Sequence, residues 1–265
     1  MEIGIIGLGV VGKACKAGFE HCGYNVCVHD IALHTDISAV LNTEICYVCV
    51  PTPSKTNGSC DTSIVDSVVE KLINANYEGI IAIKSTITPG HTQTLIDRYN
   101  TDRILFVPEF LKERSAEYDF IFDQKLLLVG TQNINNYYVV VRSHGDLPKK
   151  QMRITPTEAE IMKYYHNTFN ATRIVFANIM FELCQNIDAD YDKVKEAFLN
   201  NNAMPDEYLD VSVGQLRGYG GACLPKDVRA MQTFCEQLGL PFDFFKTLDK
   251  ENSKFDITVF DGMRL

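Results

Sequence analysis

The chain has 265 residues, which is long enough to bury a full hydrophobic core and to form one or two domains. Its hydrophobic content of 46% and its charged content of 22% are ordinary for a soluble globular protein. The net charge of -9 argues against nucleic acid or an anionic membrane surface as the partner of this protein.

Cysteine content and the N-terminal residues indicate the cellular compartment. The nine cysteines are an odd number and lack the spacing of a small disulfide scaffold. Residues 1–5 read as a strand rather than as a signal peptide, and no segment reaches the apolar length of a membrane span. We therefore expect a cytoplasmic protein whose thiols stay free in a reducing environment.

The first part of the chain alternates short apolar strands with helices. Strands are predicted at residues 2–6, 24–29, 45–50, 80–84, 105–107 and 126–129. Helices are predicted at residues 11–22 and 62–75. This alternation is typical of a parallel sheet with helices on both faces, so we expect a Rossmann-like, doubly wound α/β domain.

The pattern changes after Pro156. Residues 157–185 have helical apolar spacing, and Thr155 and Glu158 suit the N-terminal cap of a long helix. Further helices are predicted at residues 191–200 and 225–238. The sequence therefore predicts a sheet domain at residues 1–155, a small all-helical domain at 156–252 and a short tail at 253–265.

Two cysteines, Cys46 and Cys49, have the C-x-x-C spacing that can bind a metal ion. They lie in the apolar run of residues 45–50, which is predicted to be a strand. Residues three apart in a strand point to opposite faces. We therefore expect both side chains to be part of the core, and we expect no metal site.

The glycine motif of residues 7–12 reads Gly-Leu-Gly-Val-Val-Gly and fits G-x-G-x-x-G. It follows a strand, opens a helix and precedes a second strand that ends at Asp30. A dinucleotide needs this tight turn, a backbone close to the diphosphate, and a carboxylate for the adenosine ribose. Because Asp30 would repel a 2′-phosphate, the sequence predicts NAD rather than NADP. The alternative is a glycine-rich turn that binds no ligand.

Polar side chains follow three of the predicted strands. They are Thr52, Thr86 and the carboxylates of Glu109 and Glu113. Ligands bind at the carboxyl ends of parallel strands, so the hydroxyls could bind ribose, nicotinamide or water. One of the carboxylates could be a general base. The alternatives are ordinary strand-end turns and a solvated loop.

Glu160, Lys163 and Asn167 have spacings of three and four residues, so they share one face of the long helix. Lys163 and Asn167 could together hold an oxyanion or orient a carboxylate. The alternative is an exposed helix face that carries an ion pair.

The run of residues 218–227, Gly-Tyr-Gly-Gly-Ala-Cys-Leu-Pro-Lys-Asp, contains a candidate nucleophile. Its glycines allow a sharp turn, and Pro225 suits the first position of a helix. Cys223 would then lie where helix amides favour a thiolate, with Asp227 one turn later on the same face. The alternative is a helix start with a buried cysteine, because a free cysteine often behaves as a small hydrophobic residue.

Together these motifs resemble the UDP-glucose/GDP-mannose dehydrogenase family, in the family's order from residue 1 to about residue 252. The decapeptide at residues 218–227 is the specific part of the resemblance. The resemblance implies that a nucleotide sugar, with UDP-glucose as the first candidate, is oxidised at C6 to a carboxylate with two NAD. It implies a thiohemiacetal and a thioester on Cys223, and a homodimer through the central helices.

The resemblance also implies roles for single residues. Cys223 resembles the nucleophile of the family. Lys163 and Asp227 resemble the pair that assists proton removal and holds water, and Asn167 resembles the oxyanion donor. Thr86 and Glu113 resemble the residues that place water for thioester hydrolysis. Positions around NAD correspond to Gly7, Gly9, Val11, Gly12, Asp30, Thr52, Thr86 and Lys226. Positions along the sugar nucleotide correspond to Glu109, Phe110, Leu111, Lys163, Asn167 and Gly220.

Two features depart from the family pattern. Family members continue into a second Rossmann-like domain that grips the nucleotide, whereas this sequence ends at Leu265. We therefore expect the chain to lack that domain and to have weak or no activity alone, because remote binding energy orients the reacting centre. In addition, Arg217 stands where a small or apolar residue is expected.

Two other hypotheses compete with a nucleotide-sugar dehydrogenase. The first is an NAD-binding remnant that acts as a dimerisation or regulatory partner. The second is a β-hydroxyacid dehydrogenase, which shares the Rossmann domain, the following helices and a Lys/Asn helix pair. The chemistry of such an enzyme needs no cysteine, so Cys223 in its glycine turn argues against the second hypothesis.

Overall fold

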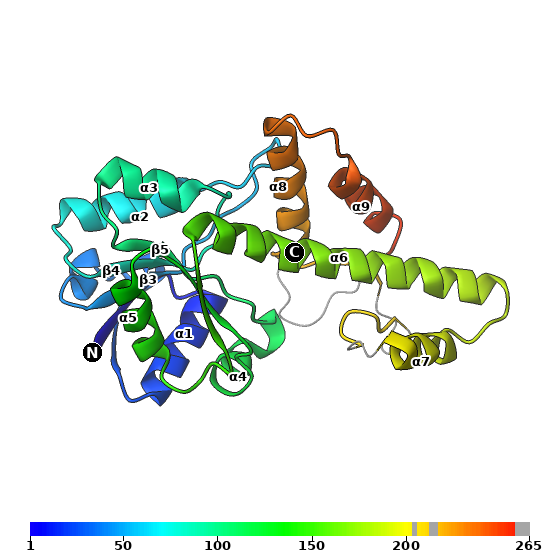
Figure 1. The fold of residues 1–265 in the computed structure, drawn as a ribbon, viewed down its shortest axis with the longest axis horizontal. Coiled ribbons are helices and arrows are strands. Elements are labelled where there is room, and N and C mark those ends of the chain that lie inside the picture. Colours follow the sequence, from blue (N-terminus) through cyan, green and yellow to red (C-terminus); the bar gives the residue numbers. More distant parts are fainter. Residues whose placement is uncertain (203–205, 212–216, 258–265) are drawn as a thin grey trace. The chain divides into compact units, whose positions relative to one another are not determined.

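The computed structural model describes residues 1–202, 206–211 and 217–257. The chain forms two compact units (Figure 1). The first unit contains residues 1–53 and 60–163, and the second contains residues 54–59 together with the chain from residue 164. The division lies inside the long helix, between Lys163 and Tyr164.

The first unit is built on a seven-stranded sheet with the order β2-β1-β3-β4-β5-β6-β7. Its strands are β1 (Glu2–Ile6), β2 (Asn25–His29), β3 (Ile45–Val48), β4 (Ile80–Ile83), β5 (Ile104–Phe106), β6 (Leu127–Gly130) and β7 (Gln151–Ile154). Strands β1 to β5 are parallel, which confirms the predicted α/β fold class. β6 pairs antiparallel to β5, and β7 pairs parallel to β6.

The sequence predicted a parallel sheet that included residues 126–129, and this was wrong for β6, which runs antiparallel to β5. The edge strand β7 was not predicted. An apolar run identifies a buried strand but not its direction, because a strand that is buried on both faces reads alike either way. β7 lies at the edge of the sheet and is largely exposed, so it lacks the apolar signal.

Helices cover both faces of the sheet in the first unit (Figure 1). They are α1 (Val10–His21), α2 (Ser63–Asn74), α3 (His91–Tyr99), α4 (Ala116–Phe122) and α5 (Ile134–His144). Apolar side chains of α2 and α3 pack on one face, and those of α1, α4 and α5 pack on the other. Alternate residues of the central strands supply the two cores, as the pleat of a strand requires.

The C-x-x-C pair illustrates this alternation. Cys46 is buried in the core that contains α2, whereas Cys49 packs against the core that contains α1. The prediction that these two side chains point to opposite faces and pack in the core is confirmed.

In the part of the chain that the structure describes, the second unit is helical. It contains most of α6 (Pro156–Asn186), followed by α7 (Tyr191–Asn202), α8 (Leu224–Gln237) and α9 (Phe244–Asn252). The predicted cap of α6 is confirmed, because Glu158 accepts a hydrogen bond from the Thr155 amide at 2.8 Å. Of the predicted tail, Phe255 packs against a small core that contains Tyr219 and Leu248, and residues 258–265 lie outside the described residues.

A membrane span is not found: among the described residues, every helix is too short or too polar to cross a bilayer.

Candidate functional site

The glycine turn between β1 and α1 fits a dinucleotide. Gly7 has φ +91°, and a Cβ there would lie 2.7 Å from the Cys49 carbonyl oxygen. A Cβ at Gly12 would lie 2.0 Å from the Gly7 carbonyl oxygen, so both positions need glycine. A Cβ at Gly9 would meet nothing within 4 Å. Open space at Gly9, beside the first-turn amides of α1, is the cradle that a diphosphate requires.

Asp30 follows β2, which is the neighbour of β1 in the sheet. Its carboxylate accepts hydrogen bonds from the Leu8 amide at 2.5 Å and from the Ala32 amide at 2.7 Å. These two bonds hold the pKa of the Asp30 carboxyl below its ordinary value. An anion is therefore fixed against the glycine turn, where the ribose hydroxyls of a dinucleotide would bind. Val11 lies in the first turn of α1 and is half-buried.

The strand order reverses between β1 and β3, and the ends of β3 and β4 lie beside this point. Thr52 is buried just after β3. Ser85 follows β4 and donates to the Val50 carbonyl oxygen at 2.6 Å. Thr86 is half-buried, and its carbonyl oxygen accepts from the Cys60 thiol at 3.4 Å. The hydroxyls of Thr52 and Thr86 thus occur at the edge of the sheet where ligands bind in such folds.

The loop after β5 carries the predicted substrate residues. Glu109 is buried, and its carboxylate accepts from the Lys84 ammonium at 2.8 Å and from the Phe110 amide at 3.0 Å. Its carbonyl oxygen accepts from the Lys163 ammonium at 2.5 Å. A carboxylate that is already paired with a buried cation is poorly suited to act as a general base. Leu111 packs against the core that contains α1.

Lys84 itself was missed as a functional candidate in the sequence. Burial alone would lower the pKa of its ammonium, but the adjacent Glu109 carboxylate outweighs this effect and raises the pKa above its ordinary value. The only signal in the sequence is a lysine directly after an apolar strand.

Glu113 begins a short 3-10 turn, Glu113–Ser115, and is half-buried.

The residues on the predicted face of α6 each have a different partner. Glu160 accepts from the Gly90 amide at 2.5 Å and from the Thr92 amide at 2.8 Å, and burial raises the pKa of its carboxyl. It thereby caps α3 in place of a local residue. Within the first unit Lys163 contacts Glu109, and within the second unit Asn167 contacts Asp227.

Cys223 is exposed and occupies the N-cap position of α8. The alternative of a buried cysteine is therefore excluded. Helix α8 begins at Leu224, one residue earlier than predicted, so Pro225 is its second residue instead of its first. Gly218 and Gly221 have φ of +54° and +74°, so they turn the chain in a way that favours glycine.

Asp227 is completely buried one turn into α8. Its amide donates to the Cys223 carbonyl oxygen at 3.0 Å. One carboxylate oxygen accepts from the Asn167 amide group at 2.5 Å, and the other accepts from the Lys226 ammonium at 2.6 Å. Both oxygens of a buried carboxylate are thus satisfied beside the candidate nucleophile. Gly220 is half-buried in the same loop.

Asn252 fixes this loop, and the sequence analysis did not identify that role. The side-chain amide of Asn252 accepts from the Tyr219 amide at 2.7 Å and donates to the Tyr219 carbonyl at 2.9 Å. Arg217 pairs with Glu182, and its guanidinium lies 5.3 Å and 5.2 Å from the ring centroids of Phe181 and Phe255. The departure at Arg217 therefore has a structural explanation.

In the first unit the structure thus brings the glycine turn, Asp30 and the threonines to one edge of the sheet, and it joins Glu109 to Lys163. In the second unit it joins Cys223, Asp227, Asn167 and Lys226. A metal-binding cluster of His, Cys, Asp or Glu is not found among the described residues.

Comparison with known proteins gives a consistent result. Residues 31–143 match the model of the NAD binding domain of the UDP-glucose/GDP-mannose dehydrogenase family, and residues 157–254 match the model of its central domain. A UDP-glucose 6-dehydrogenase of Rickettsia bellii is 30% identical over 200 residues, covering 72% of this chain and 45% of the relative. Bacillus subtilis TuaD, a UDP-glucose 6-dehydrogenase, is 27% identical and covers 90% of this chain and 53% of the relative. The chain thus spans about half the length of these curated relatives.

Among solved structures, a UDP-glucose dehydrogenase from Pyrobaculum islandicum has a TM-score of 0.85 and 26% identity, covering 96% of this chain and 68% of that chain.

Proposed function

This chain belongs to the UDP-glucose/GDP-mannose dehydrogenase family, and we propose that it oxidises C6 of a nucleotide sugar, UDP-glucose in the first place, to a carboxylate. The cofactor of the domain at residues 31–143 is NAD. The observation that carries the proposal is the exposed Cys223 thiol at the start of α8, beside a buried Asp227 that Asn167 and Lys226 hold.

The geometry of the first unit supports most of the residues that we assign to NAD binding. Gly7, Gly9 and Gly12 form the cradle for the diphosphate, and Val11 contributes an amide of the first turn of α1. Asp30 binds the adenosine ribose. Further contacts are proposed for Thr52, Thr86 and Lys226. When bound, NAD accepts one hydride in each of the two oxidation steps.

Oxidation of the alcohol requires a group that takes the hydroxyl proton, and we assign this step to Lys163 and Asp227 acting with a water. The Cys223 thiolate then adds to the aldehyde carbon, so that a C–S bond forms and the carbonyl electron pair moves to oxygen. The amide of Asn167 stabilises this oxyanion. The trapped aldehyde cannot escape before the second oxidation.

Loss of the second hydride from the thiohemiacetal carbon produces a thioester on Cys223. Water adds to its carbonyl, the C–S bond breaks, and the thiolate leaves with its electron pair while the carboxylate forms. Thr86 and Glu113 place this water. Phe110, Leu111 and Gly220 line the sugar nucleotide, together with the backbone of Glu109.

The test is to incubate the chain with NAD and UDP-glucose and to count the NADH formed per sugar. Two NADH per sugar are expected, and Cys223→Ser should abolish turnover. Cys22→Ser is the matched control, since Cys22 is a free thiol at the C-terminal end of α1. Full turnover by Cys223→Ser would refute the mechanism.

The second candidate function is an NAD-binding remnant that acts as a dimerisation or regulatory partner. Tight NAD binding without turnover would support it. Turnover of small hydroxy acids alone would instead support a β-hydroxyacid dehydrogenase. A 3-hydroxyisobutyrate dehydrogenase of Mycobacterium tuberculosis shares the fold, with a TM-score of 0.74 over 96% of this chain and 92% of that chain, at 13% identity.

We also propose that the protein is a homodimer through α6. Large apolar side chains are exposed along this helix at helical spacing, and they are Tyr165, Phe169, Phe176, Ile179 and Leu183. Such a stripe marks an interaction surface, and a second copy of the same helix would cover it. Because all nine cysteines are free thiols, we place the protein in the cytoplasm.

A further inference from the structure

Two cysteines meet below the glycine turn of the first unit. Cys15 is fully buried on α1, whereas Cys49 directly follows β3 and is half-buried. A Cβ at Gly12 would lie 3.6 Å from the Cys49 Cβ, and Cys15 lies three residues after Gly12 on the same face of α1. The side chains of Cys15 and Cys49 hydrogen-bond to each other. Both pack in the core that contains α1, so the two thiols are neighbours.

The backbone of Cys49 supports the dinucleotide turn. Its amide donates to the carbonyl oxygen of Ile6, the last residue of β1, at 2.7 Å. Its carbonyl oxygen would lie 2.7 Å from a Cβ at Gly7, so it packs directly against the turn. A displacement of Cys49 therefore reaches the glycines that we assign to the diphosphate of NAD.

The two thiols differ in access and in electrostatic surroundings. A reagent from solution can reach the half-buried Cys49, whereas the core shields Cys15. Burial raises the pKa of the Cys15 thiol and the hydrogen bond with Cys49 raises it further, but the nearby Lys84 ammonium opposes both effects. Cys49 is thus the thiol that reacts with a reagent, and Cys15, with a cation close by, is the thiol that displaces it.

We propose that Cys15 and Cys49 form a reversible disulfide that weakens NAD binding. The Cys49 thiolate attacks a small-molecule disulfide, so that a mixed disulfide forms and one small thiolate leaves. The Cys15 thiolate then attacks the Cys49 sulfur, the Cys15–Cys49 bond forms, and the second small thiolate leaves with its electron pair. The two cysteines lose two electrons and two protons, and the reagent gains them. The inference rests on NAD binding by the first unit and is independent of the chemistry proposed for Cys223.

Formation of this disulfide requires a movement next to the turn. An S–S bond is about 2.05 Å long, which is shorter than the contact between two hydrogen-bonded thiols, so the sulfur atoms must approach each other. Cys15 is held inside a helix, whereas Cys49 lies in the irregular segment after β3, so Cys49 is the residue that moves. Its carbonyl then shifts against Gly7, and we expect NAD to bind about tenfold more weakly.

The test equilibrates the full chain with reduced and oxidised glutathione and maps the cross-linked peptides by mass spectrometry. A Cys15–Cys49 cross-link is expected, with an NAD affinity in calorimetry that is about tenfold lower in the oxidised chain and is restored by reduction. By linkage, saturating NAD should favour the reduced pair by the same factor, which raises its reduction potential by about 30 mV. Calorimetry uses a Cys223→Ser background, because the exposed Cys223 also reacts with glutathione.

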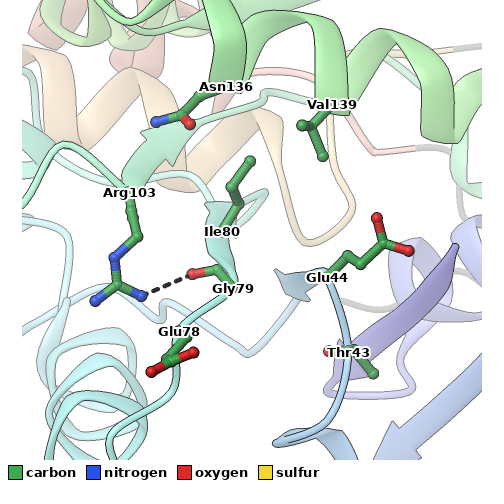
Figure 2. A pocket seen from close by; sticks show the side chains of 8 residues that line it. All are labelled: Thr43, Glu44, Glu78, Gly79, Ile80, Arg103, Asn136 and Val139. Atoms are coloured by element: carbon green, nitrogen blue, oxygen red, sulfur yellow. Dashed lines mark hydrogen bonds between the residues drawn. The ribbon is translucent and has the colours of Figure 1, made fainter.

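Cys15→Ser and Cys49→Ser should each abolish the loss of NAD affinity on oxidation, and Cys49→Ser alone decides where Cys15→Ser does not fold. Cys27→Ser is the matched control and should retain the loss, since Cys27 is another half-buried thiol of the first unit. Asn136→Ala should also retain it. Asn136 lines a cavity of about 400 Å³ at the amino ends of β3, β4 and β5, the edge of the sheet opposite the glycine turn (Figure 2).

Two results would overturn the inference. The first is oxidation of Cys223 by glutathione while Cys15 and Cys49 stay unlinked under the most oxidising buffer. The second is a Cys15–Cys49 cross-link that leaves the NAD affinity unchanged. If the chain forms no NADH from UDP-glucose, the proposed function fails, but the NAD affinities of the reduced and oxidised chains still decide this inference.

Discussion

Replacement of Asn252 by alanine should destabilise the second unit and loosen the loop that carries Cys223. Asn252 is 4% exposed and is the last residue of α9. Its amide satisfies both backbone groups of Tyr219, at 2.7 Å and 2.9 Å, and Tyr219 is itself 1% exposed. A buried polar group without a partner costs about 1–3 kcal/mol, so two such groups cost about 2–6 kcal/mol. This is a large share of the roughly 5–15 kcal/mol that stabilises a typical domain.

The control is Asn186→Ala. Asn186 is the last residue of α6 and donates to the Glu182 carbonyl oxygen at 2.8 Å, but it is exposed, so water replaces the lost bond. Urea unfolding followed by circular dichroism should show a loss of about 0.5 kcal/mol or less for this control. Asn252→Asp keeps the acceptor for the Tyr219 amide and loses the donor, so about 1–3 kcal/mol is expected.

Hydrogen exchange gives a second measurement of the same perturbation. The Tyr219 amide should exchange faster in Asn252→Ala and should stay protected in Asn252→Asp, which retains its acceptor. If Asn252→Ala is as stable as Asn186→Ala and the Tyr219 amide stays protected, the reasoning is wrong, and the loop is held by other contacts.

Three further predictions follow from the geometry. Gly9→Ala should fold like the wild type, since φ of Gly9 is -73° and the added Cβ fills only open space, but it should bind NAD more weakly in calorimetry. Gly12→Ala should instead unfold at a lower temperature in thermal unfolding, because its Cβ would lie 2.0 Å from the Gly7 carbonyl oxygen. Burial lowers the pKa of His144 from 6.5 to about 3, so between these values the unfolded chain binds a proton that the folded chain does not. Stability should therefore fall on acidification below about pH 6.5, and the fall should be smaller in His144→Phe, measured by urea unfolding at several pH values. Phe176→Glu should convert a dimer to a monomer in light scattering, whereas Phe122→Glu should not, although the two side chains are similarly exposed, 57% and 60%.

Local patterns in the sequence were sufficient to predict the central strands of the sheet and the long helix. The apolar runs of β1, β3 and β4 are buried on both faces, so each reads as an uninterrupted strand. Gly7 and Gly12 could be identified because each turn position excludes a side chain, which leaves a fixed spacing in the sequence. Features of this kind depend on residues that are close together along the chain.

Features that depend on distant residues could not be predicted in the same way. The first turn of α3 is capped by Glu160, which lies 68 residues after Thr92. The sequence near α3 therefore contains no cap residue from which the start of the helix could be predicted. Lys84 and Glu109 are 25 residues apart, and Asn252 and Tyr219 are 33 residues apart. The sequence around a lysine or an asparagine does not show whether its side chain is solvated or buried with a partner. Only the fold distinguishes these two environments.

The cysteines show what the fold adds to a motif. All nine lie in the described part of the chain, and Cys223 is the exposed one, while the others are buried or half-buried. A thiol in a core behaves as a small apolar group, whereas a nucleophile must be reached by its substrate. The sequence alone could distinguish Cys223 only by the glycines before it and the proline after it. The fold shows that Cys223 is exposed at the start of α8, after a loop in which Gly218 and Gly221 have positive φ and Asn252 binds Tyr219.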